Sequence, residues 1–230
     1  MSVYVNRALN MKAIKAIGFD MDFTLVRYHS EIFEQLTYQE TIKKFKEDDK
    51  YPINFDEFEF RFDIAMRGLI LDKKRGNVLK TSGFSKVKTS FHGTKPIPFN
   101  EQQRIYKNLC IDINDANFYP LDTIFSIAHA TLFMQLVTFK DDNPAIDLPT
   151  YEEIEADVIK YVDICHRDGS IKNQVIKDLQ KYIIQDPEIV ETLKRLKRNG
   201  KLLWLITNSH FDYTKALMDY TFLPFLDGQH

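Results

Sequence analysis

Two carboxylates and a hydroxyl lie close together near the start of the chain, at Asp20, Asp22 and Thr24. Side chains alternate along an extended backbone, so Asp20 and Asp22 would face one site while the residue between them points away. In isolation this D-x-D-x-T stretch is equally compatible with two surface acids and a residue that caps a turn. A second polar pair, Thr207 and Asn208, comes late in the chain. The positions of both pairs favour a shared site.

Each of these polar pairs follows a short apolar run. Residues 14–19 read IKAIGF and lead into Asp20, while residues 202–206 read LLWLI and lead into Thr207. Runs of this length and composition predict parallel strands that are buried in a sheet. Open α/β sheets bind their ligands at the carboxyl ends of such strands. The sequence therefore predicts a ligand site at this edge of the sheet.

The order of elements indicates an α/β protein with an interrupted core. Asp186 and Pro187 predict the start of a helix that leads into the second strand. This helix-to-strand unit is typical of a doubly wound core, which we assign to residues 1–29 and 186–230. Residues 30–185 are far more than one crossover between parallel strands requires, so they predict a large inserted domain.

The insertion has signals of both helices and strands. Residues 68–71, 77–81 and 84–89 are strand-like runs separated by glycine-containing turns, which predicts an antiparallel meander. Later, Thr150 and Glu153 have the spacing of a capping box at the start of a helix. We therefore expect an α+β insertion.

Two carboxylates in one pocket could divide the work of phosphoryl transfer. One attacks phosphorus, while the other donates a proton to the leaving oxygen and later takes one from water. Magnesium would neutralise charge on the phosphoryl oxygens, because this ion prefers hard oxygen ligands. Thr207, Asn208 and nearby backbone N–H groups would hold the remaining phosphate oxygens. The pattern thus predicts a phosphohydrolase.

The same residues carry a resemblance to a known superfamily. An apolar strand followed by Asp20-x-Asp22-x-Thr24, with a later apolar strand followed by Thr207, resembles the first two motifs of the haloacid dehalogenase superfamily. The resemblance implies that Asp20 is the nucleophile and Asp22 the general acid and base. It also implies a Rossmann-like core with an inserted cap, and a Mg²⁺ ion held by the Asp20 carboxylate, the Asp22 backbone carbonyl and a later acidic motif.

A closer resemblance covers nearly the whole chain. Several segments in the same order are similar to the cytosolic purine 5′-nucleotidases, which prefer IMP and GMP: residues 5–7, 18–25, 67–69, 76–80, 163–172 and 207–209. The resemblance implies a cytoplasmic, Mg²⁺-dependent hydrolase of purine nucleoside 5′-monophosphates. Enzymes of this type assemble into oligomers, so a homo-oligomer is also expected.

The resemblance assigns substrate recognition to the inserted cap. It implies that Phe125 stacks on the purine and that Asp163, His166 and Lys172 contact the base, ribose or phosphate. From the residues alone, Phe125 fits core packing about as well. His166 and Lys172 likewise fit a solvated junction between two helices, beside a Gly-Ser turn.

Substrate choice stays open because the chain departs from the family pattern in the cap. Ile159 stands where the family has an Arg, and Arg167 follows His166 where the family has a Tyr. Three alternatives remain: a phosphatase of the same fold for a sugar phosphate or pyrimidine nucleotide, a phosphotransferase that uses a nucleoside as acceptor, and a non-catalytic nucleotide-binding module.

Composition excludes several other classes of protein. Lys and Arg number 31 against 33 Asp and Glu, so the net charge of -2 provides no global field for nucleic acid or an anionic membrane. Two cysteines, Cys110 and Cys165, suit a reducing compartment better than a disulfide framework. The sequence has no signal-peptide pattern and no apolar stretch of about 18 residues. We expect a soluble cytoplasmic protein without nucleic-acid or membrane partners.

One part of the implied machinery is missing from the sequence. The superfamily needs a Lys and at least one further Asp on strands beyond the Thr207 motif. Residues 208–230 contain Asp212, Asp219 and Asp227, but none of them follows an apolar strand. We therefore expect a core that is incomplete at its C-terminus, with further sequence in the active protein.

Overall fold

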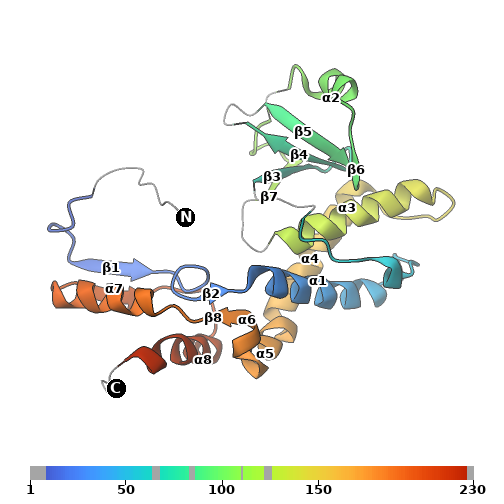
Figure 1. Cartoon of the computed structure of the whole chain (residues 1–230). Coiled ribbons are helices and arrows are strands. Elements are labelled where there is room, and N and C mark those ends of the chain that lie inside the picture. Colours follow the sequence, from blue (N-terminus) through green and yellow to red (C-terminus); the bar gives the residue numbers. More distant parts are fainter. Residues whose placement is uncertain (1–8, 64–67, 83–85, 110, 122–125, 227–230) are drawn as a thin grey trace. The chain divides into compact units, whose positions relative to one another are not determined.

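The computed structural model describes residues 9–63, 68–82, 86–109, 111–121 and 126–226. The chain divides into two compact units (Figure 1). Residues 1–29 and 175–230 form the first unit, and residues 30–174 form the second. Helices and strands together give a mixed α/β protein, as predicted. Within the described ranges, the helices are too short or too polar to cross a membrane.

The first unit contains a pair of parallel strands and a pair of antiparallel strands. Its elements are β1 (Ala16–Phe19), β2 (Arg27–Tyr28), α6 (Leu179–Tyr182), β8 (Ile183–Ile184), α7 (Pro187–Arg198), β9 (Leu202–Leu205), α8 (Phe211–Phe222) and the 3-10 helix η2 (Leu223–Phe225). Strands β1 and β9 are parallel, with Phe19 opposite Leu205, whereas β2 and β8 are antiparallel. One parallel pair is compatible with a doubly wound core, which stays a prediction.

Helix α7 begins as its sequence predicted. The Asp186 side chain accepts a hydrogen bond from the Glu188 backbone N–H at 3.1 Å, and Pro187 is the first helical residue. Val190, on the buried face of α7, packs into a small apolar core with Leu25 and Phe222. This core fixes α7 against the loop that follows β1.

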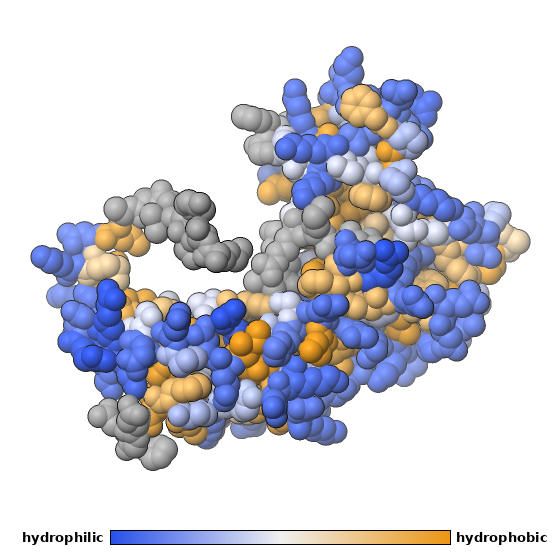
Figure 2. All heavy atoms as spheres, in the orientation of Figure 1, coloured by the Kyte–Doolittle hydropathy of each residue, from blue (hydrophilic) through white to orange (hydrophobic). Residues whose placement is uncertain are grey.

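The expectation that β1 is a buried strand is wrong for the part of the chain that the structure describes. Ala16 and Gly18 are exposed, and on the neighbouring strand Leu202 and Trp204 are each 62% exposed. Among the described residues, β1 pairs with β9 alone, so no further strand covers the pair. Figure 2 shows apolar patches between the polar side chains of this unit. Composition alone could not reveal this exposure, because an apolar run reports only that burial would be favourable.

The second unit consists of an antiparallel sheet and several helices. Its elements are α1 (Ser30–Lys46), the 3-10 helix η1 (Phe55–Glu57), β3 (Leu69–Asp72), β4 (Asn77–Thr81), β5 (Val87–His92), β6 (Lys95–Pro96), α2 (Phe99–Tyr106), β7 (Phe118–Leu121), α3 (Ile127–Asp142) and α4 (Tyr151–Arg167). The five-stranded sheet has the order β6-β5-β4-β3-β7. The predicted meander is confirmed as β3, β4 and β5, with the third strand extending to His92 instead of residue 89; residues 84 and 85 of that prediction lie outside the described residues.

The core of the second unit lies among α1, α3, α4 and the sheet. Phe45 and Phe133 are fully buried there, together with Leu71 from β3. The turn between β5 and β6 approaches α3 so closely that a Cβ on Gly93, at φ +51°, would lie 2.9 Å from the Thr138 backbone nitrogen. Only glycine fits this position without moving the helix.

The capping box at the start of α4 is confirmed. The Thr150 side chain accepts from the Glu153 backbone N–H, and the Glu153 carboxylate accepts from the Thr150 backbone N–H at 2.8 Å. The Thr150 hydroxyl also donates to the Glu153 carboxylate, and this bond and the one from the Thr150 backbone N–H lower the pKa of Glu153. The helix therefore begins where the sequence predicted.

The structure groups residues 175–185 with the first unit, although the sequence analysis placed them in the insertion. This segment ends in β8, where Ile183 pairs with Tyr28 of β2. The segment contains the end of α5 (Ser170–Lys177) and all of α6. The assignment of the two units to a catalytic core and a cap remains a prediction.

Candidate active site

Asp20 is the first residue after β1, and pairing with β9 fixes its backbone. Phe19 lies opposite Leu205, and the Ile206 N–H donates to the Phe19 carbonyl oxygen at 2.8 Å. The Asp20 side chain is exposed, and its Oδ1 accepts from the Met21 N–H at 2.8 Å. Met21 itself is fully buried. The carboxylate of Asp20 is thus presented to solvent at the carboxyl end of β1, while the expectation that Asp20 and Asp22 face one site stays a prediction.

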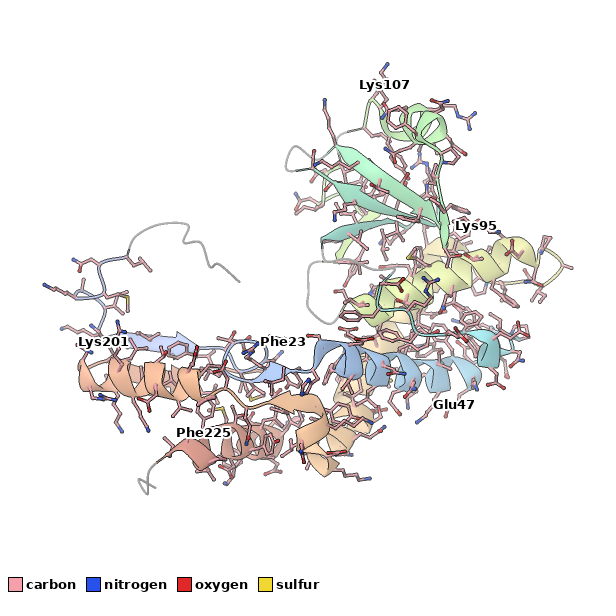
Figure 3. All side chains as sticks on the ribbon, in the orientation of Figure 1. Phe23, Glu47, Lys95, Lys107, Lys201 and Phe225 are labelled. Carbon is pink, nitrogen blue, oxygen red and sulfur yellow. The ribbon has the colours of Figure 1, made fainter. Side chains whose placement is uncertain are left out.

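A tight turn follows Asp20. The Met21 carbonyl oxygen accepts the backbone N–H groups of residues 24–26 at distances between 2.9 and 3.3 Å. Phe23, labelled in Figure 3, occupies the left-handed region with φ 57°. A positive φ is uncommon for a residue other than glycine, so the surrounding bonds must hold it. The turn brings Asp22 into a backbone bridge with Val26.

Asp22 receives a hydrogen bond from a buried tyrosine. The Tyr28 hydroxyl donates to Asp22 Oδ1 at 2.5 Å, and the Tyr28 and Tyr213 hydroxyl oxygens lie 3.2 Å apart. Each tyrosine hydroxyl carries one proton. Because Tyr28 uses its proton on Asp22, Tyr213 is the donor in the bond between the tyrosines. Both rings are buried, with 4% and 5% exposure.

Burial raises the pKa of both tyrosines. For Tyr28, proximity to Tyr213 and Asp22 adds to this effect. For Tyr213, the hydrogen bond with Tyr28 opposes the effect of burial, and the Asp22 charge adds to it. Both phenols therefore stay protonated at neutral pH and remain hydrogen-bond donors. Neither tyrosine was predicted from the sequence as part of the site. Tyr28 follows Asp22 by a few residues and could have been noticed, but no local pattern connects Tyr213 with Asp22.

Thr207 and Asn208 lie in the loop between β9 and α8. The Thr207 Oγ1 accepts from the Ser209 backbone N–H at 3.1 Å, which orders the loop before α8 begins at Phe211. Thr207 is half-buried and Asn208 is exposed. Since β1 and β9 are parallel neighbours with aligned ends, the Asp20 and Thr207 loops leave the same edge of the sheet. This placement can present a nucleophile and phosphate-binding groups to one ligand.

The described residues offer oxygen donors of the kind that Mg²⁺ prefers. They are the exposed carboxylate of Asp20 and the backbone carbonyl of Asp22. Within the described residues, however, no group of three His, Cys, Asp or Glu side chains could hold a metal ion. Asp219 of α8 forms an ion pair with Lys215 on the same helix, and Asp227 lies outside the described residues. The donor chemistry fits Mg²⁺, but the set is partial.

Three of the residues assigned to substrate binding come together in the second unit. Asp163 and His166 lie on α4, and Lys172 lies on α5. Burial and the nearby Lys172 charge lower the pKa of His166, while Asp163 opposes them. The His166 ring faces Phe33, with ring centroids 6.3 Å apart. Asp163 also forms an ion pair with Arg167 at 2.6 Å. Arg167 occupies one of the two positions where the chain departs from the family pattern.

The predicted cap also includes Phe125 and Ile159. Phe125, expected to stack on the purine, lies outside the described residues, so its role stays a prediction. Ile159 is half-buried on α4 and cannot replace the charge of the Arg that it substitutes. Of the polar residues expected to bind substrate in the second unit, two thus lie on α4 and one on α5.

Comparison with known proteins identifies the family of the chain. The model of the 5′ nucleotidase family matches residues 3–230, which is almost the entire chain. The chain belongs to the 5′-nucleotidase family.

The curated relatives have names from the same 5′-nucleotidase family. A 5′-nucleotidase domain-containing protein of Dictyostelium discoideum is 28% identical over 99% of this chain and 39% of its own length. The human 5′-nucleotidase domain-containing protein 2 is 28% identical over 97% of the chain and 44% of its own length. The rat protein of that name is also 28% identical, over 97% of the chain and 42% of its own length. The chain thus spans about two-fifths of these relatives.

Proposed function

We propose that the protein hydrolyses nucleoside 5′-monophosphates, with IMP and GMP as preferred substrates, to a nucleoside and inorganic phosphate. Membership of the 5′-nucleotidase family supports the substrate class. The observation that carries the proposal is the position of Asp20, which is exposed directly after β1 and next to the loop of Thr207. A carboxylate in such a position can reach the phosphorus of a bound phosphate ester.

The reaction has two steps, each with a balanced transfer of atoms. In the first, an oxygen of Asp20 attacks phosphorus, the bond from phosphorus to the nucleoside O5′ breaks, and Asp22 gives its proton to O5′. In the second, Asp22 takes a proton from water, the water oxygen attacks phosphorus, and the bond from phosphorus to Asp20 breaks. Phosphate is released and both carboxyl groups return to their starting states.

The phosphate needs groups that neutralise and orient it. We assign Thr207 and Asn208 to binding its oxygens, since both occupy the loop beside Asp20. A bound Mg²⁺, held by the Asp20 carboxylate and the Asp22 carbonyl oxygen, would supply positive charge for the phosphoryl oxygens. The remaining ligands would come from residues other than those that the structure describes.

We assign substrate choice to the second unit. Asp163, His166 and Lys172 offer an anionic, a neutral and a cationic group close to one another. The base would be recognised by polar contacts from these residues and by stacking on Phe125. If so, Phe125→Ala should reduce the preference for purine over pyrimidine nucleotides more than it reduces hydrolysis of a small phosphate ester.

The test is phosphate release from a panel of nucleoside 5′-monophosphates, sugar phosphates and p-nitrophenyl phosphate, with and without Mg²⁺. We expect IMP and GMP to be hydrolysed fastest, and activity to require Mg²⁺. A parallel reaction with added inosine would detect transfer to a nucleoside. Preference for a sugar phosphate, or no hydrolysis of any nucleotide, would overturn the proposed function.

A further inference from the structure

The general acid and base, Asp22, belongs to a hydrogen-bonded chain that reaches into the interior of the first unit. Its Oδ1 accepts from Tyr28, whose hydroxyl in turn accepts from Tyr213. The distances along this chain are 2.5 Å from Tyr28 to Asp22 and 3.2 Å between the two tyrosines. The bond to Asp22 is short, as expected for a hydroxyl that donates to a carboxylate.

Rigid elements hold both tyrosines. Tyr28 belongs to β2, where its backbone pairs with Ile183 of β8, and its ring lies 4.9 Å from the Phe23 ring. Tyr213 lies in the first turn of α8 and is 5% exposed. The chain therefore connects the loop after β1 with the helix that follows the Thr207 loop. Asp22 is anchored to both parts of the candidate active site.

We propose that Tyr28, supported by Tyr213, is a positioning residue that orients the Asp22 carboxyl group for proton transfer to and from the substrate. A carboxylate at the end of a flexible side chain can rotate, and one fixed oxygen determines the direction of the other. General acid catalysis requires that the acid lies within hydrogen-bond distance of the leaving oxygen. Misplacement by about 1 Å can cost about 100-fold in rate. This inference rests on the proposed function, because it assigns Asp22 to proton transfer.

The two tyrosines do not act alike. Tyr28 contacts Asp22 directly, so its hydroxyl should matter most. Tyr213 acts through Tyr28, because hydrogen bonds in a chain polarise one another and because it fixes the rotation of the Tyr28 hydroxyl. Removal of the Tyr213 hydroxyl should therefore have the same kind of effect on catalysis, with a smaller magnitude.

Two substrates with different leaving groups can distinguish a role of Tyr28 in positioning Asp22 from a general disturbance of the structure. A nucleoside O5′ needs a proton as it leaves, whereas p-nitrophenolate is stable without one. The rate of phosphoenzyme formation should be measured by rapid quench for both substrates, in the wild type, Tyr28→Phe and Tyr213→Phe. Tyr220→Phe, on the same helix as Tyr213, is the matched control, since Tyr220 lies outside this hydrogen-bonded chain.

We expect Tyr28→Phe to slow phosphoenzyme formation from a nucleotide by about 10-fold or more, with KM nearly unchanged. Formation from p-nitrophenyl phosphate should fall by less than about threefold, which also shows that the variant is folded. Tyr213→Phe should show a weaker form of the same pattern, and Tyr220→Phe should resemble the wild type.

Three outcomes would overturn the inference. Equal slowing with both substrates would mean that Tyr28 has a structural role only. An unchanged nucleotide rate in Tyr28→Phe would mean that Asp22 needs no such support. If the wild type forms no phosphoenzyme from either substrate, the proposed function fails and the inference fails with it. The first two results leave the proposed function intact, so the two failures can be distinguished.

Discussion

Glu155 is a buried carboxyl group whose negative charge is only weakly compensated by a nearby cation. Its replacement should therefore stabilise the protein at neutral pH. It lies on α4 and is 2% exposed. Its nearest cation is the Lys73 ammonium group, at 3.9 Å, and its Oε1 has no hydrogen-bond partner among the described residues. Burial raises the pKa of Glu155 from the ordinary value of 4.5 to about 6, and Lys73 opposes this shift only in part.

The magnitude and sign of the effect follow from this shift in pKa. A difference of about 1.5 pH units between the folded and unfolded states corresponds to roughly 2 kcal/mol. Because the pKa is higher in the folded state, folding is favoured when Glu155 is protonated. This contribution is fully present below about pH 4.5 and is lost as the pH rises through about 6. Glu155→Gln should thus stabilise the protein by about 1 to 2 kcal/mol at pH 8 and change little at pH 4.5.

Urea unfolding at both pH values measures this difference. Far-ultraviolet circular dichroism should be used, because Trp204, the only tryptophan, lies in the other unit and would not report on α4. Glu47→Gln, at an exposed carboxyl group just after α1, is the matched control and should have little effect at either pH. If Glu155→Gln destabilises the protein at pH 8, or has the same effect at both pH values, the reasoning about its buried charge is refuted.

Three further predictions concern the nucleophile, a helix start and the exposed strand pair. Asp20→Asn should abolish phosphate release while circular dichroism remains unchanged, and appreciable turnover would remove Asp20 as the nucleophile. Thr150→Ala should lower the free energy of unfolding by about 1 kcal/mol through loss of the capping box, and an unchanged urea midpoint would contradict this. Trp204→Lys should reduce self-association of the 230-residue chain, because Trp204 is 62% exposed on β9. Equal sedimentation of the wild type and the variant would contradict self-association through β1 and β9.

Local signals in the sequence predicted local structure well. Asp186 with Pro187 and Thr150 with Glu153 each specify a helix start, because the capping bonds form between residues two or three positions apart. The glycine-containing turns of the meander act over a similar range. In each case the interacting groups are close in the sequence, so the local pattern of residues is enough to predict the hydrogen bonds that form.

Features that depend on distant residues were predicted less well. The apolar run that forms β1 predicted a buried strand, yet Ala16 is exposed, because burial depends on which elements cover the strand. Residues 175–185 were expected in the insertion but group with the first unit, where residues 183 and 184 pair with β2. The link between Asp22 and Tyr213 joins residues 191 positions apart, from 22 to 213. No periodicity in the sequence can reveal a contact of that kind.

The most direct test of the proposed mechanism is to identify the residue that carries the phosphoryl group during turnover. The protein should be mixed with IMP and Mg²⁺, quenched in acid and digested, and the phosphorylated peptide should be located by mass spectrometry. Asp22→Asn should be included, because slower hydrolysis of the intermediate would increase its amount. We expect a phosphoryl group on Asp20 that is lost in Asp20→Asn. A phosphoryl group on any other residue, or phosphate release without a phosphoenzyme in either form, would contradict it.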